Sequence, residues 1–174
     1  MCASAWEYAS AIGQDSHRFV NDQELAANPD RLLMLGGVAL AGEHPLAGNS
    51  DADVVLHALT NAVSGITGHN ILGKRADELC LVQGIRDSAV YLREALSDLL
   101  AIGWHLSHLS FSIEGKRPKL APWIDAIRQR LAELTGLQLA DVGLTATSGE
   151  ELTAFGRGEG LQVFCLISVK RTDH

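Results

Sequence analysis

The apolar run Leu161–Val169 constrains the fold of this chain more than any other segment. Its apolar side chains do not alternate with polar ones, as they would in a half-buried strand. Both faces of such a strand must therefore be covered by other parts of the protein. The run predicts a central strand of a sheet.

Other segments show the periodicity of strands or helices. Strands are expected over four segments: Ala9–His17, Leu32–Leu40, Leu109–Glu114 and Val142–Thr147. Helices are expected over Asp51–Ile66, over Asp87–Ile102, and between Pro122 and Gly136. Gly36-Gly37 interrupts the second strand and indicates a bulge or a tight reversal. Ser50 and Asp51 are expected to cap the first helix.

The order of these elements is strand, hairpin, two helices, strand, helix and two strands. It predicts an α+β fold (an α/β sandwich) with ferredoxin-like elements, in which helices pack on one face of a single mixed sheet. The length of 174 residues suits one domain over 1–174, with an N-terminal extension over 1–10. The open face of the sheet needs another cover, and a partner subunit is one candidate.

Composition excludes several classes of function. A net charge of -7 argues against a general nucleic-acid binder, because no basic excess is present to neutralise phosphates. The sequence has no apolar run long enough for a membrane span and no secretion signal or transit peptide. Cys2, Cys80 and Cys165 form no pairing pattern. We therefore expect a cytoplasmic protein, or a stromal one in a plastid.

Three residues could form a metal site. Asp15 and His17 are two apart on a predicted strand and point the same way, although such pairs are usually surface hydrogen bonds. Asp53 and His57 are four apart and share a helix face. His57 lies in an apolar stretch, where a core hydrogen bond is the default and metal ligation the alternative. Asp15, His17 and His57 together would make a three-ligand site with an open position, as in catalytic zinc sites.

Three further clusters suit phosphate groups. The hydroxyls of Thr145–Glu150 follow a strand, and Glu150 could hold a hard cation such as Mg²⁺, although on this segment alone a plain polar turn is the default interpretation. Arg157 lies among alternating glycines, either as a phosphate ligand or in an ion pair with Glu159. The cations in 116–119 could bind a diphosphate or be solvated surface charge.

Taken together and in this order, the clusters resemble the 2-C-methyl-D-erythritol 2,4-cyclodiphosphate synthase family from about Ile12 to Arg171. Each motif is weak by itself, but all five occur in order over nearly the whole chain. The motifs are Asp15-x-His17, Ser50-Asp51-x-Asp53-x-x-x-His57, Pro118-Lys119, Ala146-Thr147 and Gly156-Arg157-Gly158-Glu159-Gly160.

The resemblance implies a metal-dependent phosphorus–oxygen lyase that works as a homotrimer, with active sites between subunits. Such an enzyme cyclises 4-diphosphocytidyl-2-C-methyl-D-erythritol 2-phosphate and releases CMP, in the non-mevalonate route to isoprenoids. It implies Zn²⁺ on Asp15, His17 and His57, and a second cation, Mg²⁺ or Mn²⁺, held partly by Glu150. No protein nucleophile is needed, because a phosphate of the substrate attacks.

The resemblance also implies roles for individual residues. Thr147, Glu150 and Asp53 would be catalytic. The substrate would be bound by Asn49, Ser50, Lys116, Pro118, Lys119, Thr147, Ser148, Arg157 and Glu159. Among these, 116–119 would hold the cytosine, and Arg157 and Glu159 would line a central trimer cavity that can hold an isoprenoid diphosphate.

Four departures from the family pattern define this chain. Asn49 replaces the usual His, Ala52 the usual Gly and Asn61 a common Asp, and 68–75 replaces an acidic loop that contains Pro. The ribose contacts of that loop cannot be transferred to this chain, whereas the metal ligands are intact. Two alternatives stay open: another metal-dependent phosphoryl transfer or phosphodiesterase activity, and a non-catalytic or altered-specificity trimer that binds isoprenoid diphosphates or nucleotides.

Overall fold

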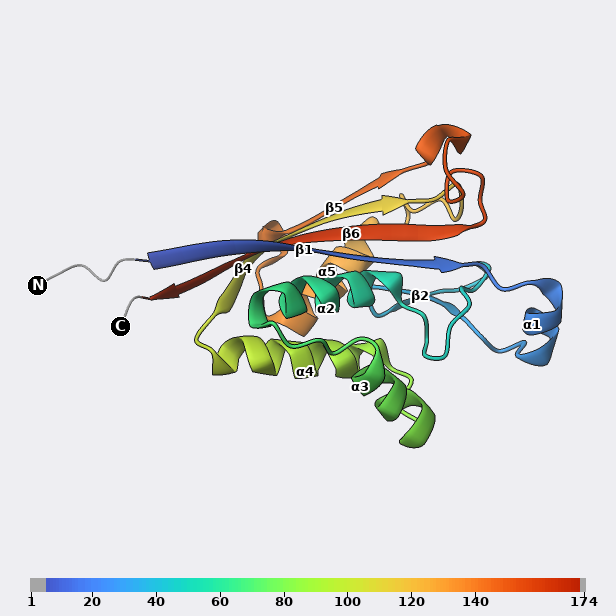
Figure 1. Ribbon diagram of the computed structural model, residues 1–174. Helices are drawn as coiled ribbons and strands as arrows, with labels where there is room; N and C mark the ends of the chain where they lie inside the picture. The colour runs from blue at the N-terminus through green and yellow to red at the C-terminus, as the bar shows by residue number, and fades with distance from the viewer. Residues whose placement is uncertain (1–5, 173–174) are drawn as a thin grey trace, which may run out of the picture.

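A computed structural model describes residues 6–172 of the protein (Figure 1). Its strands are β1 (Trp6–Arg18), β2 (Leu33–Leu35), β3 (Val38–Leu40), β4 (His105–Glu114), β5 (Val142–Thr147) and β6 (Gly160–Thr172). Its α-helices are α1 (Asp22–Ala27), α2 (Val54–Thr67), α3 (Lys74–Asp77), α4 (Ser88–Ala101) and α5 (Ile124–Thr135). Three short turns complete the chain: the π-helical η1 (Glu78–Val82) and the 3₁₀ turns η2 (Leu139–Asp141) and η3 (Gly149–Glu151).

The main sheet has four strands in the order β1-β6-β4-β5. β6 runs antiparallel to both neighbours, whereas β4 and β5 are parallel, so the predicted mixed sheet is confirmed. The predicted central strand is β6, which lies between β1 and β4. The expectation of a single sheet was incomplete, because β2 and β3 pair in a separate two-stranded hairpin that reverses at Gly36-Gly37.

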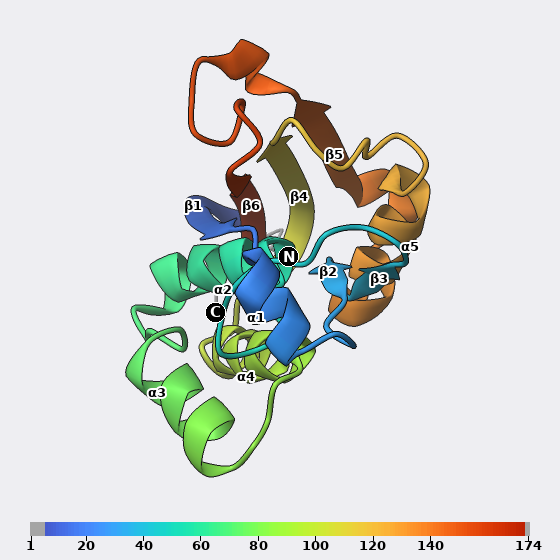
Figure 2. The same cartoon turned by 90° about the vertical axis from the view of Figure 1, so that its right-hand side faces the viewer.

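Helices α2, α4 and α5 lie on one face of the main sheet, as predicted (Figures 1 and 2). Between them and the sheet lies one continuous apolar core, to which the hairpin contributes Leu33, Leu35 and Leu40. The opposite face of the sheet exposes large apolar side chains: Tyr8, Ile12, Phe164 and Leu166. Within residues 6–172, no helix combines the length and hydropathy that crossing a bilayer requires.

Helix α2 lies unusually close to β1. A Cβ atom on Gly13 would come within 2.1 Å of the Ala58 carbonyl oxygen and 2.3 Å of the Ala62 amide nitrogen. Both atoms belong to the backbone of α2, so no side-chain movement could make room for a Cβ atom at this position. The absence of a side chain at Gly13 therefore sets the distance between β1 and α2, and with it the spacing of the functional groups they carry.

Several element boundaries differ from those expected. Residues 6–10 of the expected N-terminal extension are part of β1, where they pair with the end of β6, and residues 1–5 lie outside the described residues. Helix α2 begins at Val54 and is capped by Asp53, not by Ser50 or Asp51. Helix α5 begins at Ile124, after a turn that contains Pro122.

Candidate metal centre and active site

Strand β1 presents Asp15 and His17 on the face that α2 covers. Side chains alternate along a strand, so positions 13, 15 and 17 all face the helix layer. The side chains of Asp15 and His17 remain about one quarter exposed, because they lie near the end of the strand, beyond the closest approach of α2. This position leaves both groups accessible to a small ligand.

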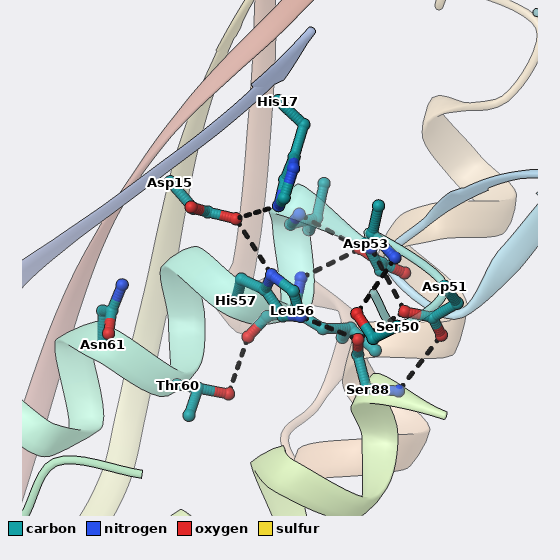
Figure 3. Close-up of polar contacts among 12 residues, drawn as sticks. Asp15, His17, Ser50, Asp51, Asp53, Leu56, His57, Thr60, Asn61 and Ser88 are labelled. Carbon is teal, nitrogen blue, oxygen red and sulfur yellow. Dashed lines mark hydrogen bonds and ion pairs between the residues drawn. The ribbon is translucent and has the colours of Figure 1, made fainter. Parts of the chain in front are cut away.

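Helix α2 places His57 against these residues. The His57 Nδ1 atom is 2.9 Å from Asp15 Oδ2, and His17 Nε2 is 3.3 Å from the same oxygen (Figure 3). The three potential ligand atoms lie within 4.8 Å of one another. Ligand atoms around a tetrahedral Zn²⁺ are about 3.4 Å apart. Two imidazole nitrogens and a carboxylate oxygen at this spacing fit a zinc ion that keeps an open position toward solvent.

The electrostatics of the cluster follow from two opposing effects. Burial raises the pKa of Asp15, but hydrogen bonds and charge from His17 and His57 outweigh it and lower that pKa to about 2. Burial lowers the pKa of His57, but Asp15 reverses this effect, helped by the charges of Asp53 and Asp51, so the net direction is upward. In the metal-free protein the cluster therefore favours a proton on His57, where a metal would otherwise bind.

We expect zinc affinity to fall steeply in mild acid, because the metal and this proton compete for His57. Below the raised pKa of His57, the apparent affinity should drop at least tenfold per pH unit, and above it the dependence should flatten. Asp15 stays ionised throughout this range and does not contribute. Zinc titrations against a competing chelator between pH 5 and 9 check this. An affinity that is independent of pH would contradict it.

The Asp53 carboxylate, expected to be catalytic, points away from Asp15 and toward backbone N–H groups. It is fully buried and accepts four backbone N–H groups, from Gly36, Gly37, Val55 and Leu56. It therefore caps α2 and ties it to the β2–β3 turn. Burial raises the pKa of Asp53, and the amides of Gly37, Leu56 and Gly36 oppose that shift. Asp53 helps to position His57 but does not face the cluster with Asp15.

A cavity of about 250 Å³ adjoins the metal cluster. It includes the predicted substrate-binding residues Asn49 and Ser50, Asn61, which replaces a common Asp of the family, and all three candidate metal ligands. It also includes residues that the sequence did not indicate: Leu72, Gly73, Ala76, Asp77, Cys80 and Tyr91. Most of these belong to α3, η1 and the loop before them, a region whose irregular sequence pattern gave no signal of a site. The Cys80 thiol lies 3.2 Å from the carbonyl oxygen of Asn49, which connects this region to the pocket.

A second cavity, of about 160 Å³, gathers the predicted phosphate and base ligands. It is lined by Gly115, Lys116, Pro118, Lys119, Leu120, Ala146, Thr147 and Ser148. Glu150 lies beside it and accepts a hydrogen bond from the Ser148 hydroxyl at 2.8 Å. Lys116 forms an ion pair with Glu151 at 2.6 Å.

One chain does not bring the two cavities together. The metal ligands lie on β1 and α2, whereas the second cavity is built at the ends of β4 and β5. β1 and β5 are the opposite edges of the four-stranded sheet. Arg157 and Glu159 form an ion pair at 2.9 Å in the loop before β6. They line neither cavity, although Phe155 and Gly158 of this loop accept hydrogen bonds from Lys116 and Arg117. Within one chain, the cluster of Asp15, His17 and His57 and the cavity at the ends of β4 and β5 therefore stay apart.

The fold and the site define a class of protein: an α+β sandwich with a candidate metal site in a polar pocket beside its edge strand. Comparison with known sequences is consistent with this class. Residues 8–170 match the YgbB family. A protein of Chlamydia trachomatis serovar L2b, named 2-C-methyl-D-erythritol 2,4-cyclodiphosphate synthase, is 46% identical over 94% of this chain and 89% of its own length. The protein of that name from Chlamydia muridarum is 47% identical over the same shares.

Solved structures have the same fold. The bifunctional IspDF from Campylobacter jejuni superposes with a TM-score of 0.84 and 27% identity over 97% of this chain, which spans 44% of that longer chain. A 2C-methyl-D-erythritol-2,4-cyclodiphosphate synthase described as a CDP-bound form gives a TM-score of 0.72 and 29% identity, over 91% of this chain and 98% of that one. The protein belongs to the YgbB family.

Proposed function

We propose that this protein cyclises 4-diphosphocytidyl-2-C-methyl-D-erythritol 2-phosphate and releases CMP. Family membership and the names of relatives at 46% identity support the reaction. The observation that carries the proposal is the convergence of Asp15, His17 and His57 beside a polar cavity. Activity with this substrate places the protein in the formation of isoprenoid precursors, and we propose a cytoplasmic location.

The reaction needs positioning and charge neutralisation rather than a nucleophile from the protein. The 2-phosphate of the substrate attacks the β-phosphorus, a new P–O bond closes the ring, and the P–O bond to CMP breaks. Both reacting groups are anionic and repel each other. Zn²⁺ on Asp15, His17 and His57, and Mg²⁺ or Mn²⁺ held partly by Glu150, would supply Lewis acidity that offsets this repulsion.

The side chains of the protein would hold the two ends of the substrate. We assign Asn49 and Ser50 to the phosphate near the metal, and Thr147 and Ser148 to the diphosphate, because hydroxyl and amide groups are suitable donors to phosphate oxygens. The cavity at 116–119 would hold the cytosine. Fixing both ends brings the reacting atoms together, which supplies the proximity contribution to the rate.

We propose that the metal cluster on β1 and α2 and the cavity at the ends of β4 and β5 are the two halves of one active site, which meet across an interface between copies of the chain. They lie at opposite edges of one sheet, so a head-to-tail ring would join the metal half of one protomer to the β4–β5 half of the next. The apolar side chains exposed on the open sheet face, such as Ile12 and Leu166, suit burial in such an assembly. We propose a homotrimer, in which Arg157 and Glu159 line a central cavity that can hold an isoprenoid diphosphate.

Mixing two inactive variants tests this arrangement. His57→Ala damages the metal half and Glu150→Ala the other half. Random mixed trimers should recover about a quarter of the active sites, since an intact site then needs one particular variant on each side of an interface. CMP release by the co-expressed variants measures this recovery. Mixed oligomers that stay inactive would show that each site lies within one chain.

Incubating the purified protein with the cytidylylated substrate and Mg²⁺ tests the reaction itself. We expect CMP and the cyclic diphosphate in equal amounts, and no acyclic phosphate product. Zinc-loaded protein that releases no CMP would refute the proposal.

A second candidate is altered specificity on the same scaffold. Residues 68–75 replace the acidic, Pro-containing loop of the family that this chain resembles, and Leu72 and Gly73 of this segment line the pocket, so contacts to the nucleoside differ. A screen of nucleotide substrates would favour this candidate if a different substrate reacts faster, and would support a phosphodiesterase if water replaces the internal phosphate as the attacking group.

A further inference from the structure

The second ring nitrogen of His57 is bound to a buried serine. Ser88 is the first residue of α4 and is completely inaccessible to solvent. Its hydroxyl oxygen lies 2.8 Å from His57 Nε2, on the side of the ring opposite Asp15 (Figure 3). The same hydroxyl is in close contact with Asp51 Oδ1, and Asp51 Oδ2 accepts the Ser88 amide at 3.1 Å. Asp51, Ser88 and His57 thus form a continuous chain of hydrogen bonds.

The chemistry of the three groups sets the direction of this chain. An ionised carboxylate can only accept hydrogen bonds, so the single hydroxyl hydrogen of Ser88 must go to Asp51. Ser88 then has only lone pairs to offer His57, and His57 Nε2 must carry a hydrogen. His57 Nδ1, 2.9 Å from Asp15 Oδ2, is then the nitrogen left for a metal: in the metal-free protein it carries the proton that it donates to Asp15, and a bound metal would replace that proton.

We propose that Ser88, held by Asp51, is a positioning residue that fixes the tautomer and orientation of His57 for metal binding. This inference rests on the proposed metal site. A histidine can bind a metal through either nitrogen, and the hydrogen bond made by the other nitrogen selects which one. Here the carboxylate of Asp51 selects the metal-binding nitrogen of His57 through the hydroxyl of Ser88 rather than by direct contact. Asp51 also accepts a hydrogen bond from the backbone N–H of Ser88. This bond holds the start of α4 in the position that the Asp51–Ser88–His57 relay requires.

Removing the hydroxyl tests the proposal. Ser88→Ala leaves His57 Nε2 without its acceptor, so zinc affinity of the metal-free protein, titrated with zinc against a competing chelator, should fall roughly 10–100-fold. Ser88→Thr keeps the hydroxyl and should restore most of that affinity. Ser64→Ala is the matched control: Ser64 is a buried serine on α2 whose hydroxyl has no hydrogen-bond partner among residues 6–172, so affinity should not change.

A spectroscopic readout on the wild-type protein does not depend on how the variants fold. Nitrogen-15 NMR of the zinc-loaded protein should show hydrogen on His57 Nε2 and none on Nδ1. Hydrogen on Nδ1, or unchanged zinc affinity in a folded Ser88→Ala variant, would overturn the proposal. If wild-type protein bound no zinc, the metal site would fail, while the presence or absence of a hydrogen on His57 Nε2 in the metal-free protein would still decide whether the hydrogen-bond chain from Asp51 exists.

Discussion

Replacing His57 with alanine should remove bound zinc and nearly all CMP release. The substitution deletes one of three protein ligands, and leaves Asp15 without the closer of its two imidazole partners. Zinc affinity should drop by more than about 100-fold, since even changes outside the ligand set cost 10–100-fold. Loss of several kcal/mol of Lewis-acid stabilisation corresponds to a fall of about 10³-fold in kcat/KM. Elemental analysis and a CMP assay measure the two effects.

His69→Ala provides the control for this experiment. His69 is an exposed histidine that pairs with Asp98 on α4 at 2.6 Å, away from the metal ligands. Its removal should change neither zinc content nor turnover by more than about twofold, because exposed ion pairs contribute little. Full zinc occupancy in the His57→Ala protein would contradict the assignment of His57 as a ligand.

Replacing Asp53 with alanine should destabilise the fold by about 3 kcal/mol or more. Four backbone N–H groups would lose their acceptor. An N-cap alone is worth about 1 kcal/mol, and each buried donor left unsatisfied costs about 1–3 kcal/mol. Urea unfolding of the metal-free protein measures the change. Because Asp53 fixes the start of α2, zinc affinity should weaken together with stability.

Asp87→Ala is the matched control, since Asp87 caps α4 through a single amide, that of Ala89. It should cost only about 1 kcal/mol. Asp53→Asn separates a structural role from a catalytic one, because it keeps an oxygen that can accept backbone amides. If the Asn variant is nearly as stable as wild type and binds zinc but has lost turnover, Asp53 is catalytic and our structural assignment is wrong.

The strands and helices could be predicted because their signals are local. The apolar run of β6 predicted an interior strand, and the alternation along β4 predicted one that is half buried. The hairpin at Gly36-Gly37 was one of two readings of the same glycine pair. The predicted start of α2 at Asp51 was wrong. Asp51 is a residue type that often caps helices, but its carboxylate is bound by Ser88, which is 37 residues away.

The residues of the candidate site likewise divide into those with a local sequence signal and those without one. The pair Asp15 and His17 could be predicted because residues two apart on a strand point the same way in any fold. The residues themselves offered His57 as an alternative third ligand and the clusters at 116–119 and 145–150 as candidates for phosphate, and the family resemblance gave these residues their expected roles. The sequence pattern gave no sign that Ser88 borders the site, because the periodicity of its helix says nothing about a contact with His57, 31 residues away. The α3–η1 region is irregular and carries no periodicity that indicates its position.

Local periodicity and residue chemistry were thus enough to specify the mixed sheet and the types of ligand that the site offers. Packing decided the rest. The close approach at Gly13 brings α2 to β1 and so His57 to Asp15. The strand order places the second cavity at the far edge of the sheet. Contacts between distant segments depend on how all the layers pack at once, and short stretches of sequence do not encode that arrangement separately.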